Sequence, residues 1–138
     1  MASHELDVTP QVGEVPRLTD WIGSSCAAEG VAQDVAFKLT LAIEEAVVNV
    51  ITHAFKGLPP AHLITVRLDV TAQSVIAEII DNGRPFNPTS APDPDLSLPL
   101  ERRSPGGLGI HLMRSMMDRV DYRRSDGSNI LRLEKARR

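Results

Sequence analysis

The strongest constraint on the fold is a long run of apolar residues at helical spacing in the first half of the chain. Between residues 32 and 56 these side chains recur in steps of three and four, until Gly57 and the pair Pro59-Pro60 end the pattern. The members of this run are Val35, Leu39, Ile43, Ala46, Val47, Val50 and Ala54. The spacing predicts one long helix over 32–56 with a single apolar face.

Strand patterns follow this helix. Residues 63–70 alternate apolar and polar side chains, and a second apolar run at 75–80 follows a polar turn, which predicts an antiparallel hairpin. The segment Ser125-Asp126-Gly127-Ser128 is a turn signal between two more strand-like runs and predicts a closing hairpin. The other predicted elements are a short edge strand at 5–9, a helix at 16–29, and a helix at 109–120.

Residues 84–106 have almost no periodicity and are rich in proline, which predicts a long irregular loop. Loops of this length in compact domains are usually lids, binding loops or disordered segments. The order of the elements predicts an α+β fold, a two-layer α/β sandwich with helices on one face of a mixed, mostly antiparallel sheet. With 138 residues, the chain is expected to form a single domain over 1–138.

Charge and cysteine content exclude several classes of protein. The net charge of -3 arises from interspersed acidic and basic residues, so no broad basic surface for nucleic acid or anionic lipid is expected. The one cysteine cannot form an internal disulfide, and the N-terminus lacks the pattern of a signal peptide. No apolar run is long enough to span a membrane. We therefore expect a cytoplasmic protein that binds neither nucleic acid nor membrane.

Three polar residues on the long helix form the first candidate site. Glu45, Asn49 and His53 are spaced four residues apart, so they are expected to share one stripe beside the apolar face. The amide oxygen of Asn49 is a suitable ligand for Mg²⁺, and Glu45 could accept a proton from a nucleophile. The alternative is that Glu44, Glu45 and Asn49 are solvated positions, with His53 a structural hydrogen-bonding residue.

The second candidate site is the segment Asp81-Asn82-Gly83-Arg84-Pro85-Phe86, directly after an apolar strand. A carboxylate at the strand end can accept a hydrogen bond from an exocyclic amine, and Gly83 allows backbone to approach a flat ring. These features suit an adenine base. The alternative is an ordinary Asp-Asn-Gly turn.

The third candidate site is Gly106-Gly107-Leu108-Gly109-Ile110, which leads from the loop into a helix. Glycines before a helix free backbone N–H groups for phosphate oxygens, and the helix dipole favours an anion there. Arg102 and Arg103, just upstream, could reach a terminal phosphate. The alternatives are a flexible hinge and solvated loop arginines. Met113, Met116, Met117 and Cys26 are most simply core residues.

Taken in order, these three segments resemble the N, G1 and G2 boxes of the GHKL ATPase superfamily, through Glu45-x-x-x-Asn49-x-x-x-His53-Ala54, Asp81-x-Gly83-x-Pro85-Phe86 and Gly107-Leu108-Gly109-Ile110. Within it, the strings Leu41-Ala42-Ile43-Glu44-Glu45-Ala46-Val47-Val48-Asn49 and Gly107-Leu108-Gly109-Ile110-His111-Leu112-Met113 resemble the anti-sigma-factor serine/threonine protein kinases of bacteria. The resemblance runs from about Glu5 to Lys135. One departure is Pro85, which stands where many relatives have the second glycine of the G1 box.

The resemblance implies a Bergerat ATP-binding fold with ATP and Mg²⁺ as ligands. It implies that Asn49 binds Mg²⁺, that Glu45 is the general base, and that Asp81 reads the adenine amino group. Ser128 matches a position where relatives often carry Thr near the adenine. The remaining residues that the resemblance assigns to ATP are His53, Gly83, Pro85, Phe86, Arg103, Gly106, Gly107, Leu108, Gly109 and Ile110.

The function implied is transfer of the γ-phosphoryl of ATP to a serine or threonine of an anti-anti-sigma (STAS-like) partner. Sequestration of a sigma factor and a homodimer are implied in the same way. No preceding helix carries an acceptor histidine, so autophosphorylation on histidine is disfavoured. One alternative is a non-catalytic module in which ATP orders residues 84–106 and so gates protein binding. Another is an interaction domain that binds no nucleotide.

Overall fold

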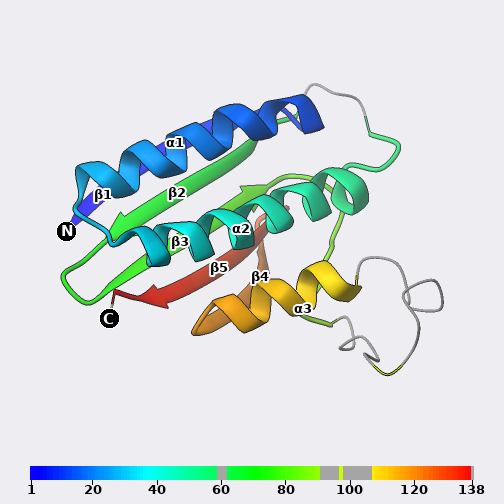
Figure 1. Ribbon diagram of the computed structural model, residues 1–138. Helices are drawn as coiled ribbons and strands as arrows, with labels where there is room; N and C mark the ends of the chain where they lie inside the picture. The colour runs from blue at the N-terminus through cyan, green and yellow to red at the C-terminus, as the bar shows by residue number, and fades with distance from the viewer. Residues whose placement is uncertain (59–61, 91–96, 98–106, 138) are drawn as a thin grey trace.

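The computed structural model describes residues 1–58, 62–90, 97 and 107–137 (Figure 1). Within them lie five strands: β1 (Ala2–Val8), β2 (Ile64–Val70), β3 (Ser74–Asp81), β4 (Arg119–Ser125) and β5 (Ser128–Ala136). The α-helices of the described part are α1 (Val15–Ala28), α2 (Gln33–Asn49) and α3 (Gly107–Met116). A π-helical turn, Val50–Ala54, follows α2, and short 3-10 turns lie at Val12–Glu14 and Pro88–Ser90.

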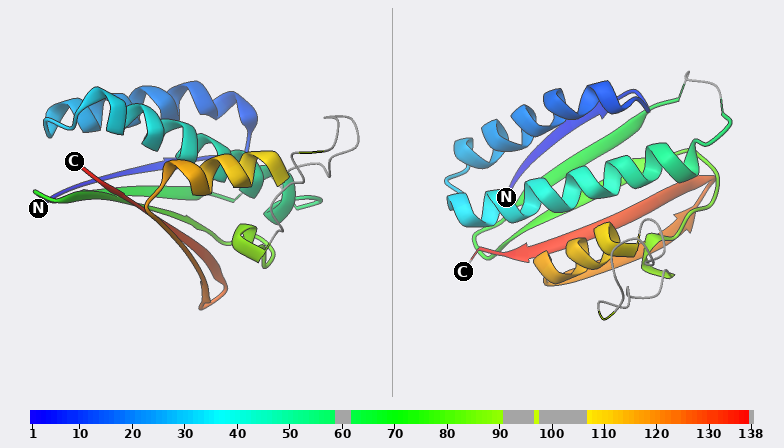
Figure 2. Two further views of the ribbon diagram at one scale, coloured as in Figure 1. Left: turned by 60° about the horizontal axis from the view of Figure 1, so that its bottom comes forward. Right: turned by 45° about the vertical axis from the view of Figure 1, so that its right-hand side comes forward.

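The strands form one sheet in the order β1-β2-β3-β5-β4, and each of its four pairings is antiparallel. Helices α1, α2 and α3 all lie over the same face of this sheet, and the opposite face carries none of the described helices (Figure 2). The predicted α+β, two-layer sandwich is confirmed. The pairing of β1 with β2 is antiparallel because two helices connect them, so the chain reverses direction an odd number of times between the strands.

Alternation along the strands sends every second side chain between the two layers. In β2, Ile64, Val66 and Leu68 are fully buried, whereas the residues between them lie on the open face. Apolar side chains of the helices meet this surface, and burial of each contributes about 1.5–3 kcal/mol. The helix residues in this core include Leu18, Ile22, Cys26, Leu39, Ile43, Met113 and Met117, with Met116 partly buried against it.

The long helix does not keep one geometry to its end. The α-helix stops at Asn49, and residues 50–54 form a π turn in which the N–H of Phe55 donates to the carbonyl of Val50 at 3.2 Å. Such wide turns are rare and occur often at functional sites. Of the predicted stripe, Glu45 and Asn49 belong to α2, whereas His53 belongs to the π turn, which has more residues per turn than an α-helix.

The closing hairpin has the predicted two-residue turn. Asp126 and Gly127 both have positive φ, 50° and 78°, as a type I′ turn requires, and Ser125 pairs with Ser128. The turn fixes the register between β4 and β5. On its other side β5 pairs with β3, where Asn129 lies opposite Asp81. None of the described helices is long and apolar enough to cross a lipid bilayer.

Candidate functional site

The last residue of β3, Asp81, is a buried carboxylate with one unpaired oxygen. The residue is 2% exposed, and its Oδ1 accepts hydrogen bonds from the Gly83 N–H at 2.8 Å and from Asn129 Nδ2 at 2.9 Å. Its Oδ2 is buried and has no hydrogen-bond donor among the described residues. An unsatisfied buried polar atom costs about 1–3 kcal/mol. Oδ2 is therefore placed for a donor on a ligand, and an exocyclic amine is such a donor.

Burial raises the pKa of Asp81 above its ordinary value, because desolvation disfavours the charged carboxylate. The two hydrogen bonds to Oδ1 and the positive charge of Arg124 act in the opposite direction without cancelling this effect. Arg124 lies close because its Nη1 donates to the carbonyl of Gly83 at 2.9 Å. A ligand amine on Oδ2 would favour the ionised form and would lower this pKa on binding.

Gly83 brings the segment after β3 into direct contact with the end of the π turn. A Cβ on Gly83 would lie 2.7 Å from the carbonyl oxygen of Ala54 and 2.9 Å from its Cβ. The next residue, Arg84, donates its N–H to that same carbonyl at 2.8 Å. The glycine was predicted to admit a flat ring. The position its Cβ would occupy is instead filled by the backbone of Ala54, which joins the second candidate segment to the first.

Gly83→Ala is therefore expected to destabilise the fold by about 1–3 kcal/mol, because a backbone carbonyl cannot move aside as a flexible side chain can. The midpoint of thermal unfolding, followed by circular dichroism, measures this loss. Gly23→Ala is the matched control, since a Cβ on Gly23 in α1 meets no atom within 4 Å. It should stabilise the protein by up to about 1 kcal/mol through helix propensity. Equal melting temperatures for the two variants would contradict the packing of Gly83 against Ala54.

Asn49, at the end of α2, presents an amide oxygen for a hard cation. The residue is 7% exposed, and its Nδ2 donates to the backbone carbonyl of Glu45 at 2.9 Å. This bond fixes the amide, and no described residue donates to its Oδ1. Mg²⁺ is usually held by one or two protein oxygens together with phosphates and water. The donor type and orientation of Asn49 fit that ion.

The carboxylate of Glu45 lies against the first turn of α3. A Cβ on Gly109 would lie 3.2 Å from Glu45 Cδ and would overlap with Oε2, so a larger residue at 109 would displace this carboxylate. The helix was predicted to begin at residue 109, with Gly107 in the segment that leads into it. The helix in fact begins at Gly107, and both glycines belong to its first turn. The free N–H groups of a first helical turn and the Glu45 carboxylate are thereby brought together.

His53 contacts Phe86 rather than the carboxylate and amide of α2. The two rings are stacked with centroids 4.7 Å apart and planes inclined by 25°. His53 is exposed and Phe86 is partly buried, so the pair closes the gap between the π turn and the segment after β3. This contact agrees with the alternative in which His53 is structural, although a contact of its ring with a bound ligand is a separate prediction.

Asn129 is the site residue that the sequence interpretation missed. It is 3% exposed and contacts Asp81 directly, whereas Ser128, the residue predicted to lie near the adenine, precedes it and points to the opposite side of β5. One signal was available, because Asn129 alternates with Leu131 and Leu133 and so occupies a core position of the strand. A polar residue at such a position calls for partners.

The other predicted ligand residues are placed as follows. Ile110 is 5% exposed and packs in the core, and Pro85 is exposed. Arg103 and Gly106 lie outside the described residues, as does the side chain of Leu108, whose backbone belongs to α3.

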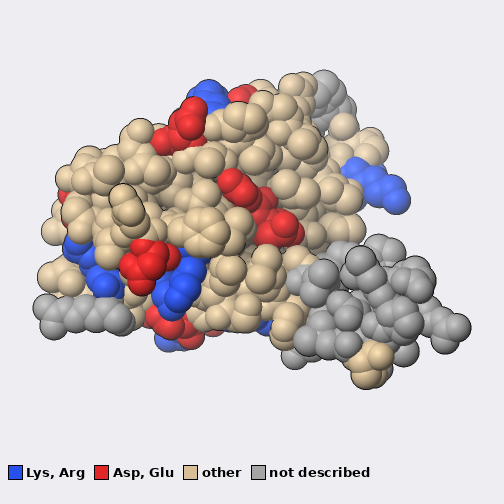
Figure 3. Space-filling model, viewed as in Figure 1, with Lys and Arg blue, Asp and Glu red and all other residues tan. Residues whose placement is uncertain are grey.

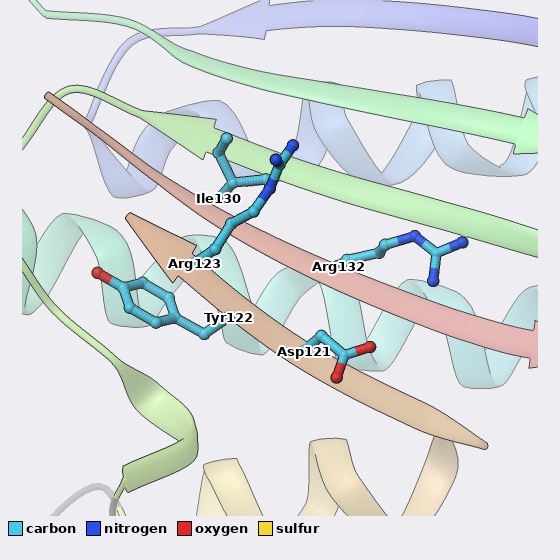
Figure 4. A pocket seen from close by; sticks show the side chains of 5 residues that line it. All are labelled: Asp121, Tyr122, Arg123, Ile130 and Arg132. Atoms are coloured by element: carbon cyan, nitrogen blue, oxygen red, sulfur yellow. The ribbon is translucent and has the colours of Figure 1, made fainter. Parts of the chain in front are cut away.

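Two further features of the described surface lie away from these residues. Acidic and basic side chains are interspersed on the helical face (Figure 3). A shallow depression on the open face of β4 and β5 is lined by Asp121, Tyr122, Arg123, Ile130 and Arg132, with the helices behind the strands (Figure 4). The described residues contain no group of three His, Cys, Asp or Glu side chains that could hold a metal without other ligands. Among the described residues, the predicted site residues lie mainly toward the end of α2, at the end of β3 and in the first turn of α3.

The features of this site are a buried carboxylate with an unpaired oxygen, a buried amide and a glycine turn beside a second carboxylate, and similarity to known proteins gives the class of the fold. The family model of the histidine kinase-like ATPase domain matches residues 8–135. The chain belongs to this family.

Within the family, the similar proteins are protein kinases of the predicted type. The chain is 43% identical over 98 residues to the serine/threonine-protein kinase BtrW of Bordetella bronchiseptica, covering 70% of this chain and 68% of BtrW. It is 25% identical over 131 residues to the serine-protein kinase RsbW of Listeria monocytogenes, covering 92% and 82% of the two chains. The predicted membership and the predicted enzyme class, a protein serine/threonine kinase, are confirmed by these relatives.

The fold has a counterpart among solved structures. The RsbU and RsbW domains of Rv1364c from Mycobacterium tuberculosis superpose with a TM-score of 0.70 at 13% identity. The match covers 98% of this chain and only 32% of the mycobacterial one. This similarity supports the fold and extends no further.

Proposed function

We propose that this chain transfers the γ-phosphoryl group of ATP to a serine or threonine hydroxyl of a small regulatory partner that resembles an anti-anti-sigma (STAS-like) protein. The observation that carries the proposal is the Glu45 carboxylate packed against Gly109 in the first turn of α3. A base next to a phosphate-binding turn is the arrangement that phosphoryl transfer to a hydroxyl needs. The relatives named as serine kinases support the same reaction.

The transfer step can be written with the residues of this chain. The partner's hydroxyl oxygen forms a bond to the γ-phosphorus, the bond from that phosphorus to the β,γ-bridging oxygen breaks, and ADP leaves. Glu45 accepts the hydroxyl proton. The carboxylate is suited to this role because none of the described side chains forms a salt bridge or hydrogen bond with it, so its oxygens are open to the acceptor.

The remaining contacts follow from the same geometry. Asp81 Oδ2 would accept from the adenine amine, the first N–H groups of α3 would donate to phosphate oxygens, and Asn49 would supply its amide oxygen to Mg²⁺. When bound, Mg²⁺ neutralises phosphate charge that develops during transfer. Arg103 as a further phosphate contact is part of the proposal.

Several wider features also belong to the proposal. They are a single functional domain over residues 1–138, a cytoplasmic location, a homodimer, and sequestration of a sigma factor in a partner switch governed by nucleotide state. They rest on the resemblance of the three sequence boxes to the anti-sigma-factor kinases.

A second candidate function is a module in which ATP gates protein binding without catalysis. The favouring observation is that Arg114 of α3 donates to the carbonyl of Thr89, next to the segment that leads into residues 91–106. A shift of α3 on phosphate binding would be transmitted to this segment.

The first test is calorimetric titration with ATP in the presence and absence of Mg²⁺. Asn49→Ala should weaken binding of Mg-ATP by about tenfold or more, as expected for the loss of one hydrogen-bonding or ligand group to a charged partner. Binding in EDTA should change little, which is the internal control. Transfer of labelled phosphate to the STAS-like proteins of the same organism then tests the reaction. Absence of ATP binding by the wild-type protein would refute both candidate functions.

A further inference from the structure

The side-chain amide of Asn129 uses all of its hydrogen-bonding capacity. Its Nδ2 donates to Asp81 Oδ1 at 2.9 Å and to the carbonyl of Arg84 at 2.7 Å. Its Oδ1 accepts from the N–H of Phe86 at 3.2 Å and from the hydroxyl of Tyr122 at 2.6 Å. A primary amide has two donor hydrogens and two acceptor lone pairs. The side chain therefore has no group left for a ligand.

These bonds decide the orientation of the neighbouring carboxylate. Asn129 and the Gly83 N–H both donate to the same oxygen of Asp81, Oδ1, so the carboxyl group is held in one rotation about its last bond. The other oxygen, Oδ2, remains buried and unpaired. Neither donor hydrogen of Asn129 is free to reach a carbonyl oxygen of a base.

We propose that Asn129 is a positioning residue that makes this site selective for a purine with a 6-amino group over a purine with a 6-oxo group or none. It acts through Asp81, by directing an acceptor at the base edge and by withholding any donor. This inference rests on the proposed ATP-binding function. Since β5 presents Asn129 directly opposite Asp81 in the sheet, the two residues are fixed relative to each other by main-chain pairing.

A purely structural role for Asn129 predicts a different result. Asn129 also ties the main chain at Arg84 and Phe86 to β5, so its loss will cost stability and will weaken any ligand that needs this segment. Such a loss would affect all purine triphosphates alike. A loss of carboxylate orientation affects only nucleotides whose base is read by Asp81.

The experiment compares ATP with purine riboside triphosphate, which lacks the 6-amino group, by calorimetric titration. Wild type should prefer ATP by about tenfold or more, the value of a hydrogen bond to a charged acceptor. Asn129→Ala should reduce this preference to within about threefold, mainly by weakening ATP. Inosine triphosphate, with its 6-oxo group, should bind the variant relatively better than it binds wild type.

Two further variants keep the test decisive if Asn129→Ala folds poorly. Asn129→Ser retains one hydroxyl hydrogen, which can serve Asp81 or Arg84 but not both, so its preference for ATP should lie between wild type and Asn129→Ala. Tyr122→Phe is the matched control, since it removes a bond to the same amide and leaves the bond to Asp81 in place. It should keep the wild-type preference.

The outcomes separate this inference from the proposed function. If wild type binds ATP but Asn129→Ala and Asn129→Ser weaken ATP and purine riboside triphosphate equally, the selectivity role is refuted and ATP binding stands. If wild type binds neither nucleotide, the proposed function fails first. A collapse of the preference in the Asn129 variants, with Tyr122→Phe unchanged, supports the inference.

Discussion

Glu45→Gln is expected to lower the rate of phosphoryl transfer by about 10²–10⁴-fold, the range usually contributed by a general base. Glutamine has the same shape as glutamate, so the contact with Gly109 should be kept and the first turn of α3 should not move. The amide cannot accept the proton of the attacking hydroxyl. Affinity for Mg-ATP should therefore change by less than about threefold, and the loss should appear in single-turnover transfer of labelled phosphate.

Glu44 provides a matched control for this variant. It is the preceding residue on α2, but its Oε1 accepts from the hydroxyl of Thr19 at 2.6 Å and so points toward α1. Glu44→Gln should keep the rate within about threefold of wild type. If both substitutions slow transfer equally, the effect comes from charge on the helix rather than from a base. If neither variant nor wild type transfers phosphate while ATP still binds, the gated module is the better description.

Most of the fold could be predicted because local patterns and tertiary packing agree. The alternation in residues 63–70 became β2, Ile64–Val70, and the Asp126-Gly127 signal became the type I′ turn. Both patterns are read from neighbouring residues alone. The sheet order β1-β2-β3-β5-β4 needed more, because it places strands side by side that are far apart in the chain.

The predicted end of the long helix and the predicted start of α3 were both misplaced, and tertiary contacts are present at each of these positions. Residues 50–54 continue the apolar helical pattern in the sequence, yet they form a π turn. The carbonyl of Ala54 accepts a hydrogen bond from the N–H of Arg84, 30 positions later in the chain. The start of α3 at Gly107 is equally unexpected, because glycine is a poor helix former. The Glu45 carboxylate packs where a Cβ on residue 109 would lie, so glycine at this position preserves a tertiary contact despite its poor helix propensity.

For the candidate site, the sequence predicted which residues would take part better than it predicted which residues they would contact. Glu45, Asn49, Asp81 and Gly109 were all predicted as site residues, and the structure brings Glu45 to Gly109 and Asn49. The interpretation of Gly83 changed, because the atoms next to the position of its missing Cβ are those of Ala54 and not those of a flat ring. Asn129 was missed because its role depends on the register between β3 and β5, and the pairing of two strands that are far apart in the chain cannot be read from either segment alone.

Asp81→Asn is expected to weaken ATP binding by on the order of 100-fold, through loss of a charged acceptor and gain of an opposed donor. The amide oxygen must occupy the Oδ1 position, because both the Gly83 N–H and Asn129 Nδ2 donate there. The amide nitrogen is then forced to the position of Oδ2 and faces the 6-amino group. Titration should show the reverse trend for inosine triphosphate, whose 6-oxo group accepts a hydrogen bond from this nitrogen.

The same substitution is expected to stabilise the protein without nucleotide at neutral pH. Burial raises the pKa of Asp81 in the folded state, so the protonated form stabilises the fold below the unfolded pKa of about 3.9, and this contribution is lost as pH rises through the folded pKa. Asparagine is neutral throughout and avoids that loss. Its melting temperature should exceed that of wild type by about 3–6 °C at pH 7, corresponding to about 1–2 kcal/mol, and the difference should shrink on acidification. A difference that is constant from pH 4 to pH 7 would show that Asp81 is not titrating in this range. Greater stability combined with weaker ATP binding would mean that the unpaired oxygen is retained for its ligand at a cost to the empty fold.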